Sequence, residues 1–222
     1  MICDVKTELP VMFSVPTANV DEKSEMSRLL ESMPDWLKEL AQTIALDRGY
    51  DSTELIKIIM AAGIAPIADI RNCWKDKELT KQYKNTDMVY DFKGNVFFVE
   101  EDGKQYRMAF KGYDKQKKCL RYSHKGKTYK IYISYDERIF LPIARSSKKF
   151  KRLYKGRTSV ERLNGRIDRD FMFEDHCIRG LKKMRTLLTL SMIIMNGMAI
   201  AKIKNGQTEG LAAITKSLSK AA

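Results

Sequence analysis

The apolar positions of the first forty-six residues predict a strand, a broken helix and a second strand. Residues 10–18 have strand character, and apolar residues at three- and four-residue spacing follow Asp21, which indicates a helix. Pro34 interrupts this pattern, and because proline lacks an amide hydrogen we expect it to break or restart the helix. Residues 43–46 form a short apolar run typical of a buried strand.

The next segment continues with a helix and another strand. Asp51 with Glu54 three residues later resembles a capping box, which predicts a helix that begins there and that Gly63 ends. Residues 64–70 are apolar again and predict a further buried strand. A strand, a helix and a strand in succession indicate an α/β layer with parallel pairing.

From about residue 75 to residue 142 the pattern changes to short alternating runs separated by turn signals. Two-residue turns at Gly94-Asn95 and at Asp102-Gly103 between such runs favour β-hairpins. The predicted strands are residues 88–92, 96–100, 105–110, 119–123, 127–134 and 138–143. This part of the chain is therefore predicted to be a β-rich insertion.

After Arg145 the apolar period becomes helical again. A stripe of apolar residues runs through Val160, Leu163, Ile167 and Phe171, and a second helix is predicted from about residue 176 to residue 203. Residues that follow, from 205 to 222, carry little core signal, so we expect a loosely attached tail.

The segment 187–203 is almost long and apolar enough to cross a bilayer. Thr189, Ser191 and Asn196 interrupt it, and Lys202 lies inside its end. We therefore favour a buried core helix, with a membrane span as the weaker alternative.

Charge indicates a class of partner. The 222 residues carry 41 Lys and Arg against 28 Asp and Glu, which gives a formal charge of +13. Residues 1–60 are acidic, whereas residues 145–157 hold seven bases and no acid, with two aromatic residues among them. Such a cluster is the electrostatic footprint of a polyanion site, and a solvated loop is equally compatible with a charge run alone.

Cysteine usage and the N-terminus narrow the class of protein further. Four cysteines stand far apart without a Cys-x-x-Cys pair, and there are two histidines, so neither a disulfide framework nor a Cys/His zinc site is predicted. Acidic residues occupy the N-terminus where a secretory signal needs a basic start and a long apolar run. We therefore expect an intracellular, reducing compartment.

Two carboxylates stand where a metal-dependent site would place them. Asp47 follows a buried strand just before a glycine turn, at the strand end where open α/β sheets bind ligands. Glu161 follows the basic run, and its spacing puts it on one helical face with Tyr154 and Arg157. Carboxylates that project into a basic groove suit a hard cation such as Mg²⁺. An ordinary surface ion pair between Arg157 and Glu161 would show the same spacing.

Three blocks of the chain closely resemble the DDE transposases of bacterial insertion sequences. Residues 45–74 resemble the second-aspartate block of that family, residues 154–184 its glutamate block, and residues 10–30 the stretch that precedes the second aspartate. The resemblance extends from about residue 4 to residue 204. It implies an RNase H-like mixed sheet flanked by helices, with a β-rich insertion before the catalytic glutamate helix.

The resemblance also assigns roles to individual residues. It implies that Asp47 is the second catalytic aspartate, that Glu161 is the catalytic glutamate, and that both hold Mg²⁺ or Mn²⁺. The residues that it and the basic run together indicate for DNA binding are Lys148, Lys149, Lys151, Arg152, Tyr154, Lys155, Arg157, Arg162 and Arg166.

One position departs from the family's Y-x2-R-x3-E-x6-K signature. Tyr154 and Arg157 match its tyrosine and arginine, but Asp168 stands where the signature has lysine. The phosphate contact of that lysine would have to come from Arg166 or Arg169.

The largest departure lies at the front of the chain. In the family the first catalytic aspartate lies on a strand upstream of anything that resembles residues 1–20, and Asp4 aligns with the end of the second strand instead. We therefore expect the first strand and the first aspartate to be missing. The predicted function is that of a fragment of a DDE transposase, for metal-dependent DNA cleavage and strand transfer in the transposition of an insertion sequence. We expect the fragment to be inactive alone, and a non-catalytic, basic nucleic-acid-binding protein is the alternative.

The predicted organisation has four parts. They are residues 1–74, the first part of the RNase H-like core from the end of strand 2 to strand 5; residues 75–144, the β-rich insertion; residues 145–204, the basic segment with the glutamate helix and the C-terminal core helix; and residues 205–222, the tail. The implied partners are double-stranded DNA of the transposon ends and the target, an upstream transposase fragment, and a second copy in the complete enzyme. No membrane partner is expected, and the implied location is cytoplasmic, with the nucleoid.

Overall fold

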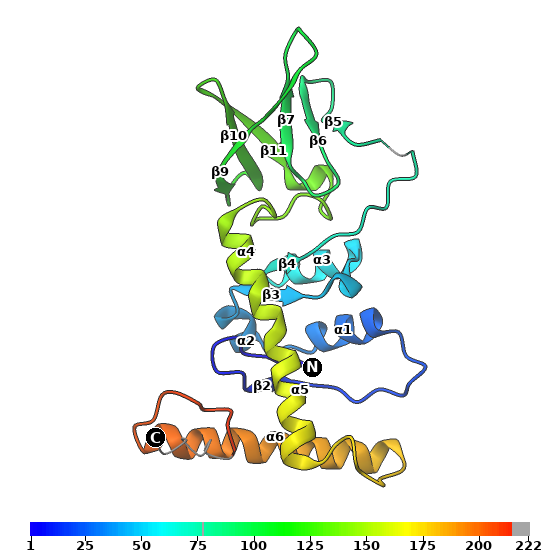
Figure 1. Ribbon diagram of the computed structural model, residues 1–222, viewed down its shortest axis with the longest axis vertical. Helices are drawn as coiled ribbons and strands as arrows, with labels where there is room; N and C mark the ends of the chain where they lie inside the picture. The colour runs from blue at the N-terminus through cyan, green and yellow to red at the C-terminus, as the bar shows by residue number, and fades with distance from the viewer. Residues whose placement is uncertain (77, 215–222) are drawn as a thin grey trace, which may run out of the picture. The chain divides into compact units, whose positions relative to one another are not determined.

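The computed structural model describes residues 1–76 and 78–214, and the chain divides into two units (Figure 1). The first unit comprises Met1–Leu29 with Gly156–Ala222, and the second comprises Leu30–Lys155. Within the described residues the chain has mixed α/β structure with four small sheets.

The first unit contains a short antiparallel pair of strands and two long helices. Its elements are β1 (Ile2–Cys3), β2 (Pro10–Met12), most of α1 (Glu22–Glu31), α5 (Thr158–Phe171) and α6 (Leu181–Lys204). Helix α5 contacts β1, and α6 contacts β2. The strand expected over residues 10–18 is therefore much shorter than predicted, and Pro16, which has no amide hydrogen to donate to a ladder, lies in the part without strand structure.

The core of the first unit forms between α5 and α6. Leu163 and Ile167 of α5 pack with Met192 and Met195 of α6, and all four side chains are buried. The apolar stripe predicted for α5 is thus confirmed at its centre. Ala212 joins this cluster, so the described part of the tail packs more closely than predicted, while residues 215–222 lie outside the described residues.

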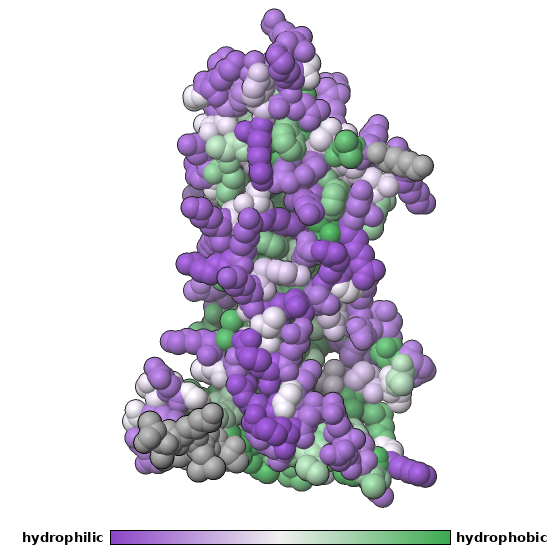
Figure 2. Space-filling view, in the orientation of Figure 1, coloured by the Kyte–Doolittle hydropathy of each residue, from purple (hydrophilic) through white to green (hydrophobic). Residues whose placement is uncertain are grey.

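Helix α6 is buried on one face only. It begins at Leu181, after Gly180 with φ of 97°, and not at residue 176 as predicted. Ser191, Met192, Met195 and Ala199 are buried. The exposed apolar residues of the helix are Leu181, Leu190, Ile193, Ile194, Ile200 and Ile203, and Figure 2 shows hydrophobic surface along the edge where α6 lies. The helix is long and apolar enough to cross a membrane by length and composition alone. The predicted buried core helix packs in the core along one face, while its other apolar face is exposed in the described chain.

The second unit contains a pair of parallel strands. β3 (Thr43–Leu46) pairs with β4 (Ala65–Ala68), and α3 (Thr53–Ala61) connects them, as the apolar pattern predicts. α2 (Asp35–Leu40) precedes them, and Pro34 is its N-cap, so the helix restarts at the predicted proline. In the part of the chain that the structure describes, β3 has no strand neighbour other than β4. The single RNase H-like sheet therefore stays a prediction.

The predicted capping box of α3 is wrong. Ser52 is the N-cap, and its hydroxyl accepts a hydrogen bond from the amide of Leu55 at 3.5 Å. The carboxylate of Asp51 instead accepts two bonds from Arg138, at 2.9 and 2.6 Å, and one from the amide of Arg71 at 2.9 Å. The carboxylate of Asp51, which the local spacing assigns to the cap of α3, is thus bound by Arg138, a residue distant in sequence.

The β-rich segment forms two antiparallel sheets, which lie together in the upper part of Figure 1. One sheet has the order β5 (Lys81–Gln82), β6 (Met88–Tyr90), β7 (Val96–Val99) and β8 (Gln105–Arg107), and the other has the order β11 (Lys127–Tyr132), β10 (Cys119–His124) and β9 (Ala109–Asp114). Their buried faces share one core that includes Leu120, Tyr122 and Ile131. Strands β6, β7 and β8 pair in sequence, which confirms both predicted hairpins.

Residues 138–143 do not form the predicted strand, although Ile139, Phe140 and Leu141 are buried. Buried carbonyl groups outside a sheet need donors from elsewhere. Arg145 supplies them, since its guanidinium donates to the carbonyls of Arg138 and Ile139 at 2.9 and 2.6 Å.

Candidate active site

Asp47 is the first residue after β3, at the carboxyl end of the parallel pair. Leu46, the last residue of β3, pairs with Ala68 of β4. The carbonyl of Asp47 accepts a hydrogen bond from the amide of Tyr50 at 3.0 Å, which closes the short helix η1 (Arg48–Tyr50). A Cβ atom at Gly49 would lie 4.0 Å from Oδ2 of Asp47, an ordinary van der Waals distance.

Asp69 occupies the equivalent position on the neighbouring strand. It directly follows β4, and Arg48 donates two hydrogen bonds to its carboxylate, one of them from Nε at 3.0 Å. Burial alone would raise the pKa of Asp69, but the bonds from Arg48 and from the amide of Ile70 outweigh it and hold the pKa below its ordinary value. The structure thus places a second carboxylate at this strand edge. Sequence reasoning missed it, because the predicted strand ran to residue 70 and so did not end before Asp69, as β4 does.

Glu161 lies in the first turn of α5 and forms the predicted pair with Arg157. The distance from Nη1 of Arg157 to Oε1 of Glu161 is 2.5 Å, and the glutamate side chain is half exposed. Tyr154, however, is the last residue of α4 (Lys148–Tyr154) and belongs to the second unit. The short helix η3 (Lys155–Arg157) separates α4 from α5, so the continuous α-helix that the predicted common face requires is interrupted.

The basic run divides into exposed and buried members. Lys148, Lys149, Lys151, Arg152 and Lys155 are exposed.

Arg145 and Phe150, in contrast, point into the second unit. Burial lowers the pKa of Arg145 to about 10, and its guanidinium also donates to the carbonyl of Ala68 at 2.9 Å. Phe150 packs against Ile56 and Ile67 and stacks on Tyr154 at a centroid distance of 5.8 Å. The aromatic residue at position 150 is therefore part of the core and not part of a DNA-binding surface.

Arg162 and Arg166 both bind the carboxylate of Glu8 within the first unit. Burial would raise the pKa of Glu8, but the hydrogen bonds from Arg166 and Arg162 dominate and hold it below its ordinary value. A partly buried carboxylate thus pairs with two of the bases indicated for DNA binding.

The carboxylate oxygens of Asp47 and Glu161 are of the donor type that Mg²⁺ prefers. The two residues belong to different units. Within residues 1–76 and 78–214, no group of three His, Cys, Asp or Glu side chains is placed to hold a metal ion. The described residues therefore offer donor chemistry that suits Mg²⁺.

Comparisons with known proteins identify the family. The family model described as Transposase DDE domain matches residues 1–196, most of the chain. No curated protein and no solved structure matches. The matched range includes Asp47, at the carboxyl end of β3, and Glu161, in the first turn of α5. The chain belongs to the transposase DDE domain family.

Proposed function

We propose that this chain serves metal-dependent DNA cleavage and strand transfer in the transposition of an insertion sequence. The observation that carries the proposal is the family match, which spans both candidate carboxylates. It favours a transposase over a non-catalytic nucleic-acid-binding protein. The proposed location of this activity is the cytoplasm, at the nucleoid.

Asp47 and Glu161 are the proposed ligands of Mg²⁺ or Mn²⁺. When bound between carboxylates, such ions activate a nucleophile and stabilise the leaving oxygen of an in-line phosphoryl displacement. The guanidinium of Arg157, with Nη1 2.5 Å from Oε1 of Glu161, orients that carboxylate for metal binding. The exposed bases of α4 and Tyr154 bind the phosphates of the transposon end.

The ligand set needs a third carboxylate. Two carboxylates leave one ion of a pair without a bridging ligand, and the described residues contain no group of three. We infer that the chain alone does not cut DNA and that a separate transposase segment completes the site. The proposed complete enzyme is a homodimer, in which a second copy covers the exposed apolar face of α6.

Iron-mediated cleavage of the polypeptide tests the metal site directly. Fe²⁺ in place of Mg²⁺, with ascorbate and peroxide, generates radicals that cut the backbone beside the ion. We expect cuts near Asp47 and near Glu161, and both cuts should disappear in Asp47→Asn. Arg121→Gln, in an exposed part of β10, is the matched control that should leave the cuts unchanged. Cuts that persist in Asp47→Asn would refute the assignment.

A nicking assay on supercoiled plasmid with Mn²⁺ tests the inferred inactivity. We expect no metal-dependent nicking by the purified chain. Robust nicking that Asp47→Ala abolishes would overturn the incomplete-site inference, although it would support Asp47 as a catalytic residue.

A further inference from the structure

A cavity of about 1320 Å³ lies within the second unit, at the amino ends of β3 and β4. Gln42, Thr43 and Ala65 line it at the start of the two strands. Asp47 and Asp69 follow the opposite ends of the same strands. Because each strand has four residues and a strand rises ~3.3 Å per residue, on the order of 13 Å separates the cavity from the carboxylate edge.

The lining of this cavity is strongly basic. Its bases are Lys57, Lys115, Lys117, Lys118, Lys149 and Arg152. Glu137 is the one acid among the lining residues, and it pairs with Lys57 at 3.5 Å. Six bases and one acid leave a net charge of +5. Apart from Lys57, none of these bases has an ion pair within the described chain.

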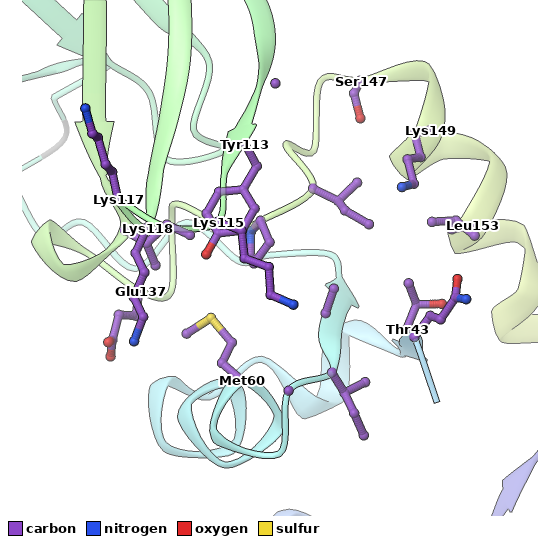
Figure 3. Close-up of a pocket in the computed structure, with 18 of the residues that line it drawn as sticks. Thr43, Met60, Tyr113, Lys115, Lys117, Lys118, Glu137, Ser147, Lys149 and Leu153 are labelled. Carbon is purple, nitrogen blue, oxygen red and sulfur yellow. The ribbon is translucent and has the colours of Figure 1, made fainter. Parts of the chain in front are cut away.

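The bases come from separate elements that converge on the cavity. Lys115 lies in the turn between β9 and β10, and Lys149 lies on α4, and Figure 3 shows the two side chains extending into the cavity from opposite sides. Tyr113 and Met60 also line the cavity, on the side of Lys115. The cationic groups are therefore distributed along the walls and do not meet at one point.

Both basic walls are anchored to the fold. The amide of Lys117 donates to the carboxylate of Asp114 at 3.0 Å, which orders the turn between β9 and β10. Helix α4 is capped by Ser147, whose hydroxyl accepts from the amide of Phe150 at 3.1 Å, and Phe150 itself is buried. Anchored elements keep these unneutralised bases on the cavity walls before any ligand binds, so neutralisation by an anion is favourable.

The size and the charge distribution indicate the ligand. Sites for small molecules usually enclose about 300–1,000 Å³ and place a few polar groups at defined points. This cavity is larger, and its charges follow two facing walls, which suits the repeated phosphates of a polymer. We propose that the cavity is a second binding site for duplex DNA, which it holds by the phosphate backbone at the strand edge opposite Asp47. The inference rests on the proposed DNA-binding role of Lys149 and Arg152, and it adds the turn between β9 and β10 to that surface.

Salt-dependent binding of a fluorescent duplex by the full chain tests this site. Each phosphate contact contributes about 0.9 to the slope of log K against log salt. In the triple variant Lys115→Gln, Lys149→Gln, Arg152→Gln we expect that slope to fall by about 2 to 3, and the affinity to fall about tenfold or more at low salt.

A matched variant controls for the loss of charge. Lys111, Lys127 and Lys130 are exposed on β9 and β11 and do not line the cavity. The triple change of these three lysines to Gln removes the same charge from the same unit, and we expect it to change affinity less than about twofold. Equal losses in both triple variants would overturn the site and leave only a non-specific charge effect.

Acetylation of lysines in the wild-type chain gives a second readout that does not depend on how a variant folds. Bound duplex should protect Lys115 and Lys149, but not Lys111 or Lys130, when the products are mapped by mass spectrometry. Lack of protection at Lys115 in the complex would refute the proposal, and so would tighter binding of duplex RNA than of duplex DNA.

The outcomes separate this inference from the proposed function. A wild-type chain that does not bind duplex DNA would refute both. Loss of duplex affinity in the cavity variant alone, combined with iron-mediated cuts that persist in Asp47→Asn, would support the cavity as a DNA site and refute the proposed metal site.

Discussion

Replacement of Arg145 by methionine should be among the most damaging single changes in the second unit. The side chain is 9% exposed, and its guanidinium donates to the carbonyls of Ala68, Ile139 and Arg138. These carbonyls belong to the end of β4 and to the buried loop before α4. Methionine fills similar space but donates no hydrogen bond, so these acceptors lose their partners.

The magnitude follows from the burial of those acceptors. The bonds to Ala68 and Ile139 are buried, and an unsatisfied buried acceptor costs about 1–3 kcal/mol. The two together amount to about 2–6 kcal/mol. Methionine removes a guanidinium whose burial is itself unfavourable, as the lowered pKa of Arg145 shows, which offsets part of this loss. We therefore expect Arg145→Met to lower the free energy of unfolding by about 2–4 kcal/mol.

Urea unfolding followed by tryptophan fluorescence measures this effect, since Trp36 and Trp74 both lie in the second unit. Arg145→Lys keeps one cationic donor group and should fall between the wild type and Arg145→Met. Arg121→Met, at an exposed position of β10, should change stability by less than about 0.5 kcal/mol. If Arg145→Met were as stable as Arg121→Met, the buried hydrogen bonds could not be what holds residues 138–143 in place.

Three further predictions concern the cap of α3, the ion pairs of α5 and the exposed face of α6. Ser52→Ala should destabilise the second unit by about 1 kcal/mol, because it removes the hydrogen bond that caps α3. Thr53→Ala, at an exposed position, should be nearly neutral. Equal effects of the two changes in urea unfolding would contradict the capping role of Ser52. The pKa of Glu8 is lowered in the folded state, so its stabilisation is present above its unfolded pKa, near 4.5, and is lost as pH falls through the folded pKa. The stability of the folded chain, followed by its helical circular dichroism signal, should therefore fall less between pH 5.5 and pH 3 in Glu8→Gln than in the wild type. An unchanged pH profile would contradict this role of Glu8. Ile193→Asp should weaken self-association measured by light scattering, because this 61% exposed side chain lies on the uncovered face of α6. The control Lys204→Asp should leave self-association unchanged. A wild-type chain that stays monomeric at high concentration would refute the predicted contact.

Local patterns predicted those parts of the fold that local physics determines. The parallel unit of β3, α3 and β4 follows from short apolar runs around an amphipathic helix, and the hairpins follow from glycine turns such as Gly94 and Gly103, which have φ near 78°. The incorrect predictions share a cause. Asp51 is bound by Arg138, 87 residues away, and the carbonyls of the loop before α4 are satisfied by the nearby Arg145. In both cases a side-chain partner that the local pattern does not include overrode the local signal.

The candidate site could likewise be predicted from the sequence only in part. Asp47 and Glu161 could be proposed from the sequence because one follows a buried strand and the other matches a spaced motif. Asp69 needed the register of β3 and β4 before its position beside Asp47 could be recognised. The basic turn at residues 115–118 gave no signal as a site, because its role depends on facing α4 across a cavity.

Charge in this chain therefore has three distinct uses that a count of +13 cannot separate. Arg145 is buried and satisfies carbonyls, and Arg162 is paired with Glu8. Lys115 and Lys149 have no such partners in the described chain and face a shared cavity. Only charges of the last kind release counterions in full when phosphates bind, since the others are already neutralised or withdrawn from solvent. The affinity of this chain for DNA should thus follow the unpaired bases of the cavity and of α4, and not its net charge.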